Sequence, residues 1–310
     1  MDENRNSINC PGCDSLDVQA IGDIAPSCDF AGRRLEHELE GGRLCRCHSC
    51  QLWFRYPRQS AAELNKLYRS GSEKNWSSPV AQRTDWRLIR QCLASQKGIK
   101  RVLDIGCFDG RLLEYLGKDY HRLGIEIHDE AAQRARGRGV QIVGRDFDNL
   151  PALHPPADAV MAVDVIEHCL DPRAMLRGMA SCVRPGGYIV VASGNTETPT
   201  WRLMGSRYWY CHIAEHISFI SPSWVKNVAA ELGLDILHVR RFSHAQNHVQ
   251  VKQKIYETSA NLLLRIAPRL FAMSRKCGLG KIDLRQFPGL ALAPPYWMTA
   301  KDHILVVLRR

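Results

Sequence analysis

The sequence has no long apolar run and no repeated segment. None of its uninterrupted hydrophobic stretches approaches the ~20 residues needed to span a bilayer, and its start, MDENRNSINC, has neither the basic nor the apolar part of a leader peptide. Internal repeats and low-complexity tracts are absent, which argues against a repeat architecture. With 45% hydrophobic and 24% charged residues, we expect an ordinary globular protein in the cytoplasm.

The first 239 residues carry no net charge. They hold 29 basic and 29 acidic side chains, whereas residues 240–310 hold 13 Lys and Arg against three Asp and Glu, so the whole net charge of +10 lies there. A basic segment is typical of contact with nucleic acid, an anionic membrane surface or a phosphorylated substrate, and a solvated face has the same composition. The segment lacks the interleaved aromatics of a base-stacking platform, so a nucleic-acid-binding protein is the weaker interpretation.

The dinucleotide fingerprint G-x-G-x-x-G is missing, although residues 100–118 have the layout of a ligand-binding strand, turn and helix. Residues 102–105 form the strand, and the turn follows the spacing G-x-x-x-G at Gly106 and Gly110. Asp104 and Asp109 would repel a pyrophosphate and attract a cation. Asp109 is equally suited to be the N-cap of the following helix. The stretch therefore favours a cationic ligand.

Strands and helices alternate beyond this turn, which predicts an α/β protein with a doubly wound parallel sheet. Glu126 ends the second strand, 20 residues beyond Gly106, where a carboxylate can accept both hydroxyls of a ribose. Asp146 and Phe147 follow the third strand, although Asp146 alone could simply cap a turn. The later strands are expected at 159–163, 188–192, 234–241 and 303–308, with helices beginning at Asp171-Pro172 and Ser221-Pro222.

The stretch KRVLDIGCFDG at 100–110 resembles the first motif of the class I S-adenosylmethionine-dependent methyltransferases, whose cofactor carries a sulfonium and an ammonium. The resemblance implies a seven-stranded Rossmann-like sheet with an antiparallel last strand. Phe108 stands where that family often has a glycine. The positions implied to bind the cofactor are Asp104, Gly106, Cys107, Phe108, Gly110, Glu126, Ile127, Asp146, Phe147 and Asp164.

Two C-x-x-C knuckles, Cys10 to Cys13 and Cys47 to Cys50, predict a structural zinc site with four thiolate ligands. Cys45 competes for the site, and Cys28, His37 and His48 are weaker alternatives. A strand hairpin around Gly41-Gly42 would fill the long separation between the knuckles. A redox pair or free thiols is the other interpretation. The remaining cysteines of the 12 fit a reducing compartment, since several fall in predicted core elements.

The N-terminal order of two knuckles, an aromatic strand ending at Pro57 and a short helix resembles the zinc-binding segment of methyltransferases from bacterial cell-surface glycan and secondary-metabolite pathways. The resulting division is a zinc-ribbon-like segment at 1–58, a linker with helices at 59–98, a methyltransferase domain at 99–241, a basic helical insertion at 242–302 and the last sheet strand at 303–310.

The resemblance implies O-methylation of a sugar or glycan-type acceptor. If the basic insertion contacts this acceptor, we expect the acceptor to be phosphorylated or lipid-linked. Residues 164–168 also resemble quinone-biosynthesis methyltransferases, so a quinone or other aromatic acceptor is the alternative. The basic insertion is alternatively a contact with the anionic inner membrane surface.

A hydroxyl acceptor needs a base near the sulfonium, because it is a poor nucleophile at neutral pH. His168 follows the fourth strand, and the segment after the fifth strand supplies His212, Glu215 and His216. The pair Glu215-His216 resembles an E-H pair of such methyltransferases, so His216 is our expected base, with Glu215 as its helper or a substrate ligand. The alternative is that His216 caps the following helix or packs against Trp209.

Overall fold

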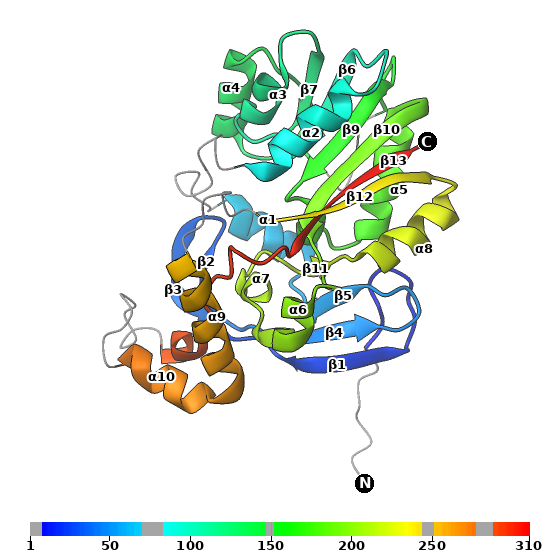
Figure 1. The fold of residues 1–310 in the computed structure, drawn as a ribbon. Coiled ribbons are helices and arrows are strands. Elements are labelled where there is room, and N and C mark those ends of the chain that lie inside the picture. The colour runs from blue at the N-terminus through cyan, green and yellow to red at the C-terminus, as the bar shows by residue number, and fades with distance from the viewer. Residues whose placement is uncertain (1–7, 70–82, 147–149, 151, 244–250, 277–287) are drawn as a thin grey trace.

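The computed structural model of the protein describes residues 8–69, 83–146, 150, 152–243, 251–276 and 288–310. It contains a large sheet with helices on both faces and a smaller N-terminal sheet below its lower end (Figure 1). The linker around Trp76 and the residue Phe147 lie outside the described residues.

The large sheet has seven strands in the order β12-β13-β10-β9-β6-β7-β8. The strands are β6 (Arg101–Ile105), β7 (His121–Ile125), β8 (Gln141–Gly144), β9 (Ala157–Val163), β10 (Val183–Gly194), β12 (Asp235–Phe242) and β13 (His303–Arg309). β13 pairs antiparallel with both of its neighbours, whereas β10, β9, β6, β7 and β8 are mutually parallel. The expected α/β class and seven-stranded Rossmann-like sheet are therefore confirmed.

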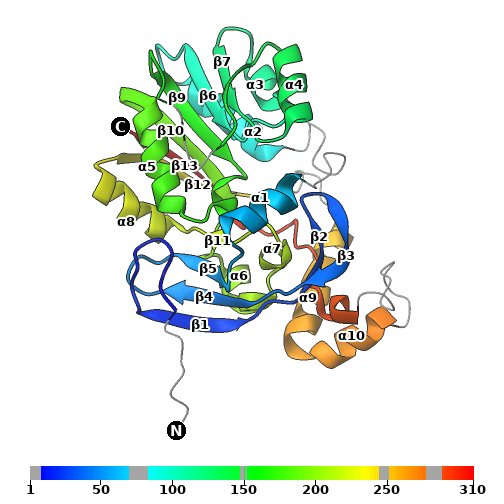
Figure 2. The ribbon, with the colours of Figure 1, turned by 180° about the vertical axis from the view of Figure 1, so that it is seen from behind.

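Helices cover both faces of this sheet because its central strands are apolar on both sides. α2 (Thr84–Ala94), α3 (Arg111–Leu116) and α4 (Asp129–Gly137) pack on one face, and α5 (Pro172–Cys182) and α8 (Pro222–Leu232) pack on the other, as Figures 1 and 2 show from opposite sides. The expected caps are present. The side chains of Asp171 and Ser221 accept hydrogen bonds from the first backbone N–H groups of α5 and α8.

The small sheet has the order β1-β4-β5-β11. Its strands are β1 (Val18–Asp23), β4 (Arg43–Cys47), β5 (Trp53–Tyr56) and β11 (Ser218–Phe219). β11 comes from the chain that follows the fifth strand of the large sheet, and it pairs with β5 through Ser218 opposite Phe54. The N-terminal segment is therefore joined to the rest of the protein by backbone pairing. α1 (Ala61–Arg69) follows, and Ser60 and Glu63 form a capping box at its start.

The predicted hairpin around Gly41-Gly42 is wrong. β3 (Arg33–Leu39) pairs with β2 (Ser27–Phe30) across Ala31-Gly32, while β4 leaves to pair with β1 and β5. The two glycines permit the crossing between sheets. A Cβ on Gly41 would lie 1.9 Å from the Ile24 carbonyl oxygen, and Gly42 has a φ of +68° with its Cβ position 2.6 Å from the Tyr56 carbonyl oxygen.

β10 begins earlier than the expected strand at 188–192, because residues 184–187 already lie within it. The register of β10 against β9 shifts between Val183 and Tyr188, so α5 ends at Cys182 and passes directly into a strand with a bulge. The remaining elements are the 3₁₀ turns η3 (Ile166–His168), η4 (Gly205–Arg207) and η5 (Pro288–Leu292), and the helices α6 (Pro199–Met204), α7 (Trp209–His212), α9 (Val251–Ile266) and α10 (Pro268–Lys276). α9 ends at Ile266, and Pro268 is the first residue of α10. Among the described helices, none is both long and apolar enough to cross a membrane.

Candidate functional site

A cavity of about 330 Å³ opens at the carboxyl ends of β6, β7 and β9. Ligands of open α/β sheets bind at this edge, and the volume is that of a small-molecule site. The residues lining the cavity are Tyr68, Arg83, Trp86, Asp104, Gly106, Cys107, Phe108, Asp109, Arg111, Leu112, Ile125, Glu126, Ile127, Val163, Asp164, Val165, His168, Ile213, Glu215 and His216.

The glycine turn after β6 brings the backbone close to this cavity. Gly106 has a φ of +69°, and a Cβ there would meet the Val165 side chain at 2.6 Å. Phe108, the departure from the usual glycine, has a φ of +47°, so it adopts the left-handed conformation that a glycine would take without strain. Its N–H donates to Glu126 Oε2 at 2.8 Å. The substitution therefore keeps the turn conformation.

Glu126 is buried at the end of β7 and is held by two backbone groups. Its Oε2 accepts from Phe108 and its Oε1 accepts from the His128 N–H at 2.8 Å. A carboxylate oxygen has more than one acceptor site, so both oxygens can still receive a hydroxyl from a ligand. The turn and the helix start thus fix the orientation of this carboxylate.

Asp104 is buried at 3% exposure, and no donor among the described residues hydrogen-bonds its carboxylate. Burial first, and then the charge of Glu126, raise the pKa of Asp104 well above its usual range, and the Arg83 cation opposes them. A cationic ligand in the cavity would stabilise the ionised form. The geometry therefore fits an ammonium or sulfonium better than a phosphate.

Asp109 is less available to a ligand than Asp104, because its carboxylate pairs with Arg111 at 2.9 Å and with Arg138 at 3.6 Å. The N-cap of α3 is Gly110, with a φ of +79°, and Asp109 lies one residue earlier. The Oδ1 atom of Asp109 also accepts a hydrogen bond from the Arg111 N–H at 3.3 Å, so Asp109 helps to cap α3 and is at the same time an ion-paired part of the cavity wall.

Asp164 faces the cavity from the end of β9 with a φ of +54°, and its Oδ2 accepts from the Arg83 guanidinium at 2.7 Å. Arg83 also pairs with the buried Asp85 of α2. Sequence reasoning missed Arg83, since nothing in its neighbourhood marks it. Cys107 and Ile127 line the cavity, whereas Asp146 is exposed and is not among the lining residues.

His168, Glu215 and His216 all line the cavity, but His212 does not. The Nδ1 atom of His212 lies 3.4 Å from the Ala25 carbonyl oxygen, and burial lowers its pKa to about 4. Glu215 Oε1 accepts a short hydrogen bond from the Ala31 N–H, at the turn between β2 and β3. The structure thus brings three of the four expected residues together.

His216 is 6% exposed, and its Nδ1 lies 3.1 Å from the Tyr210 carbonyl oxygen. A carbonyl only accepts, so Nδ1 carries the proton and Nε2 keeps a lone pair. Burial, with the nearby His168 and Arg55, lowers the pKa of His216 well below its usual range. The ring of His216 packs on Tyr210 at 4.2 Å and on His168 at 5.0 Å between ring centroids, in place of the alternative packing against Trp209. The imidazole is therefore neutral.

Residues 80–239 match the family model described as "Methyltransferase domain". The chain belongs to this family. It is 30% identical over 119 residues to a ubiquinone biosynthesis O-methyltransferase from Yersinia pestis (strain Pestoides F), and the same figures hold for the enzyme of that description from Yersinia pseudotuberculosis serotype O:1b (strain IP 31758). The match covers 35% of this chain and 49% of each relative, so the chain spans about half the length of these curated relatives.

Solved structures with a similar arrangement include the Haloferax volcanii complex of the Trm112 methyltransferase activator with a methyltransferase, at 18% identity and a TM-score of 0.49. That match covers 72% of this chain and 89% of the other. The magnesium protoporphyrin IX methyltransferase of Synechocystis PCC 6803 matches at 11% identity, with 74% and 84% coverage and a TM-score of 0.46.

Below the cavity of this methyltransferase domain, Glu167 is fully buried and is tied to two hydroxyl groups. Its Oε2 accepts from Ser193 at 2.9 Å and its Oε1 accepts a short hydrogen bond from Tyr210. Burial raises the pKa of Glu167 to about 7. Donor atoms of Glu167, His168 and His216 lie within 4.8 Å of one another. Since hydrogen bonds within the protein already occupy the carboxylate and one nitrogen of each imidazole, we describe this group as a hydrogen-bond network.

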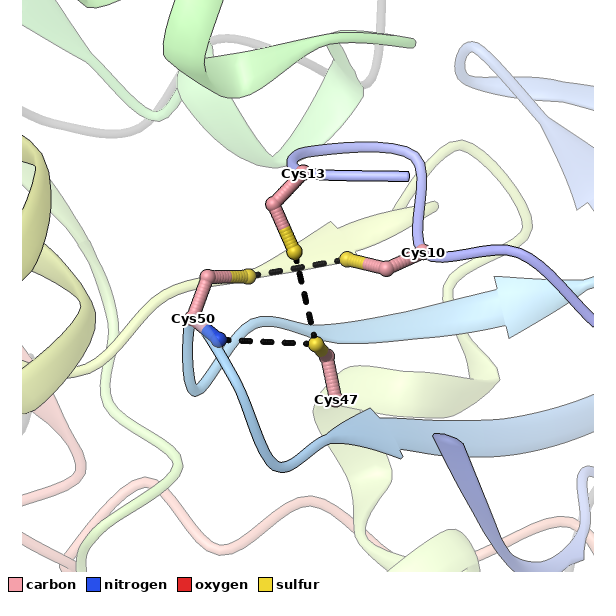
Figure 3. A group of neighbouring side chains, drawn as sticks. All are labelled: Cys10, Cys13, Cys47 and Cys50. Carbon is pink, nitrogen blue, oxygen red and sulfur yellow. Dashed lines mark hydrogen bonds between the residues drawn. The ribbon is translucent and has the colours of Figure 1, made fainter. Parts of the chain in front are cut away.

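Cys10, Cys13, Cys47 and Cys50 form a compact group at the end of the small sheet, with their sulfur atoms within 4.8 Å of one another (Figure 3). The Sγ atoms of Cys10 and Cys50 are 3.5 Å apart, and those of Cys13 and Cys47 are 3.6 Å apart. Backbone N–H groups of Gly12 and Cys50 point at the sulfurs of Cys10 and Cys47. Four thiolates so arranged are the donor set of a closed tetrahedral zinc site. The competitors Cys28, His37, Cys45 and His48 are not in the group.

Proposed function

We propose that this protein is an S-adenosylmethionine-dependent methyltransferase that acts on a hydroxyl group of a small-molecule acceptor. The observation that carries the proposal is that one cavity is lined both by the buried acids Asp104 and Glu126 and by the neutral imidazole of His216. The first two suit a cationic nucleoside, and the third suits a group that accepts a proton. Membership of the methyltransferase-domain family agrees with it.

The cofactor would be held by the turn after β6 and by the ends of β7 and β9. Glu126 would accept the ribose hydroxyls, and the carboxylate of Asp104 would balance the positive charge. Cys107, Phe108 and Ile127 supply apolar or backbone contacts, while Asp146 and Phe147 stay a prediction for the adenine. When bound, S-adenosylmethionine supplies an electrophilic methyl group on its sulfonium.

His216 would take the acceptor's proton. Its Nδ1–H donates to the Tyr210 carbonyl, so the lone pair of Nε2 is available at neutral pH. His168 would orient the acceptor from a fixed position in the cavity wall. Its ring is held there because its Nδ1 atom lies 3.0 Å from the Tyr68 hydroxyl and 3.2 Å from the Glu215 carbonyl oxygen. Glu215 is the helper in this arrangement, since its side chain fixes the loop that carries His216.

Two acceptor classes fit this site, and each has its own support. A sugar hydroxyl is implied by the resemblance to zinc-containing methyltransferases of glycan and secondary-metabolite pathways. An aromatic hydroxyl is supported by the ubiquinone biosynthesis O-methyltransferases among the relatives, and by the rings of Tyr68 and Trp86 in the cavity wall. The aromatic class therefore stands as the second candidate function.

Radiolabelled methyl transfer from S-adenosylmethionine separates the two classes, with UDP-glucose and dTDP-glucose as sugar probes and 3,4-dihydroxybenzoate as the aromatic probe. His216→Ala should lower turnover about 10²- to 10⁴-fold on the productive probe while S-adenosylmethionine affinity is unchanged. His121→Ala, which alters an exposed histidine of β7 outside the cavity, is the control and should keep full turnover. Failure to bind S-adenosylmethionine by calorimetry would refute the proposal.

The proposal has three further parts: structural zinc at the four cysteines, a phosphorylated or lipid-linked acceptor, and peripheral contact with an anionic membrane. The zinc rests on the compact thiol group, and the membrane contact rests on the basic residues of α9 and α10. We do not expect nucleic acid as a partner. The division of the chain at residues 58, 98, 241 and 302 also stays a proposal.

A further inference from the structure

Arg55 of β5 is a buried cation, and its hydrogen-bond partners among the described residues are all backbone carbonyl groups. It is 2% exposed, and no ion pair to its guanidinium is found within the part of the chain that the structure describes. Its Nη1 donates to the Gly41 carbonyl at 2.7 Å, and its Nη2 donates to the Cys211 and Ile213 carbonyls at 2.7 and 3.0 Å. Its Nε donates to the His216 carbonyl at 3.3 Å. Burying a guanidinium in this way is costly unless each N–H is satisfied, so the arrangement is a specific one.

Three of these carbonyls belong to the segment 211–216, which ends at the proposed base. The segment also has backbone hydrogen bonds of its own: the Cys211 N–H donates to the Tyr208 carbonyl, the His216 N–H to the Ile213 carbonyl, and the following Ile217 N–H to the Glu167 carbonyl. Removing the guanidinium would leave three carbonyls in a water-poor place without donors. Arg55 therefore holds the turn that presents His216 to the cavity.

Other backbone and side-chain groups of the N-terminal segment form hydrogen bonds with residues next to His216 and with His168. The Arg55 N–H donates to the Ile217 carbonyl at 3.0 Å, and β5 pairs with β11 just beyond His216. The Ala31 N–H donates to Glu215, and the Tyr68 hydroxyl contacts His168. The acceptor end of the cavity is thus built jointly by residues before 70 and residues after 160.

Arg55 is also connected to the four cysteines through one pair of strands. Leu44 of β4 lies opposite Arg55 of β5, and Cys47 ends β4, where its N–H donates to the Leu52 carbonyl at 2.8 Å. Figure 1 shows β4 and β5 side by side, and Figure 3 shows Cys47 and Cys50 at the turn that joins two neighbouring strands. A metal bound by Cys47 and Cys50 would fix the turn between these strands.

We propose that Arg55 is a positioning residue through which the four-cysteine site sets the orientation of His216. The role of His216 as the base rests on the proposed function, whereas the coupling between the cysteine site and the segment 211–217 does not. The zinc-ribbon-like segment is then a structural half of the active site and not an independent docking module.

The charge of Arg55 also affects His216. Burial, His168 and the Arg55 cation lower the pKa of His216, while the hydrogen bond to Tyr210 and the charge of Asp164 raise it. Glu167 reaches the same network through the Tyr210 hydroxyl, and Glu215 is the neighbouring carboxylate. Losing the Arg55 cation should therefore raise the pKa of His216 and shift its titration to higher pH.

The test compares Arg55→Lys and Arg55→Met in the full-length protein, with Arg43→Met as the matched control. Arg43 lies on the neighbouring strand β4, and its exposed side chain is 3.9 Å from Asp23 of β1. Hydrogen exchange of the amides 211–217 should speed up by about tenfold or more in both Arg55 variants and stay unchanged in the control. In an NMR titration, the His216 pKa should rise in Arg55→Met and stay near wild type in Arg55→Lys, which keeps the charge.

Removal of the bound metal by a chelator should produce the same faster exchange at 211–217 in the wild-type chain, with S-adenosylmethionine affinity within about twofold of the metal-loaded protein. The coupling would be overturned if the amides 211–217 of Arg55→Lys exchanged at the wild-type rate. It would also be overturned if removal of the metal left the exchange rates at 211–217 unchanged. Arg55→Lys keeps a cation and a donor, so it answers the question if Arg55→Met fails to fold. Neither measurement needs the acceptor, so a failed methyl-transfer assay would remove the proposed function and leave this inference standing.

Discussion

At the scale of single residues, the two buried acids of the cavity have different partners. Glu126 is already oriented by the N–H groups of Phe108 and His128, whereas Asp104 has no hydrogen-bond donor among the described residues. Glu126 is therefore ready to accept hydroxyls, and Asp104 gains most from a nearby positive charge. Both residues were identified from their offsets in the sequence, but this division of roles comes from their surroundings.

Glu126→Ala should weaken S-adenosylmethionine binding by about 1.5 to 3 kcal/mol, because the ribose hydroxyls lose a charged acceptor. Calorimetry measures the change directly. Glu114→Ala is the matched control, since Glu114 is an exposed acid of α3 that pairs with Arg138 outside the cavity. Equal affinities of wild type and Glu126→Ala would move the ribose contact to another residue.

Three histidines make stability depend on pH. Burial lowers the pKa of His168, His212 and His216, the second to about 4. Below about pH 6.5 these imidazoles become protonated in the unfolded chain but stay neutral in the folded protein. The free energy of unfolding therefore decreases as the pH is lowered, by up to ~1.4 kcal/mol per pH unit for each histidine. His303 acts oppositely, because Asp302 outweighs burial and raises its pKa.

His212→Asn should reduce the loss of stability between pH 7 and pH 5 by about 1 to 2 kcal/mol, because an amide does not titrate and can still donate to the Ala25 carbonyl. Urea unfolding at the two pH values measures this loss. His121→Asn, at an exposed position of β7, is the control. The same pH dependence in both variants would show that His212 does not contribute.

At the scale of elements, the end of β4 and the following turn carry the second knuckle. We expect about one zinc per chain, and Cys47→Ser should release it and destabilise the N-terminal segment, because metal binding contributes directly to folding in small sites. Metal analysis and thermal unfolding are the measurements. Cys45→Ala is the control, since Cys45 lies on the same strand but outside the four-cysteine group. Full occupancy in Cys47→Ser would move the ligand set to Cys45 or His48.

At the scale of the whole molecule, α9 and α10 project beside the small sheet (Figure 1) and expose apolar side chains next to basic ones. Val251, Ile255, Ile266, Leu270 and Met273 are between 58% and 78% exposed. The same helices carry Lys252, Lys254, Arg265, Arg269, Arg275 and Lys276. Exposed apolar residues with basic neighbours are typical of a helix at an anionic lipid surface.

Vesicles with anionic lipid should co-sediment the protein at low salt, and neutral vesicles should not, because each Lys or Arg near the surface contributes ~1 kcal/mol that salt screens. Ile255→Ser combined with Ile266→Ser should weaken the interaction, and Leu16→Ser, at an exposed residue remote in sequence, is the control. If co-sedimentation with vesicles did not depend on lipid charge or on salt, the proposed membrane contact would be contradicted. A pair of solvated helices would then be favoured.

The sequence by itself determined the positions of the strands, the glycine turn, the acid at the end of β7 and the four-cysteine group, whereas the seven-stranded arrangement was implied by the family resemblance. These features follow from short-range rules: hydrophobic period, backbone conformation at glycine, helix caps and knuckle spacing, each of which spans only a few residues. The N-caps at Asp171 and Ser221 were predictable for the same reason.

Only the tertiary structure decided how the N-terminal segment meets the acceptor end of the cavity. The pairing of β5 with β11, the contacts of Arg55 with residues 211–216 and the placing of Tyr68 beside His168 join residues more than 95 positions apart. The error at Gly41-Gly42 has the same origin, since two glycines predict a hairpin locally but here permit a crossing between sheets. Long-range pairing depends on which surfaces remain unpaired after local structure forms, and a local pattern does not contain that information.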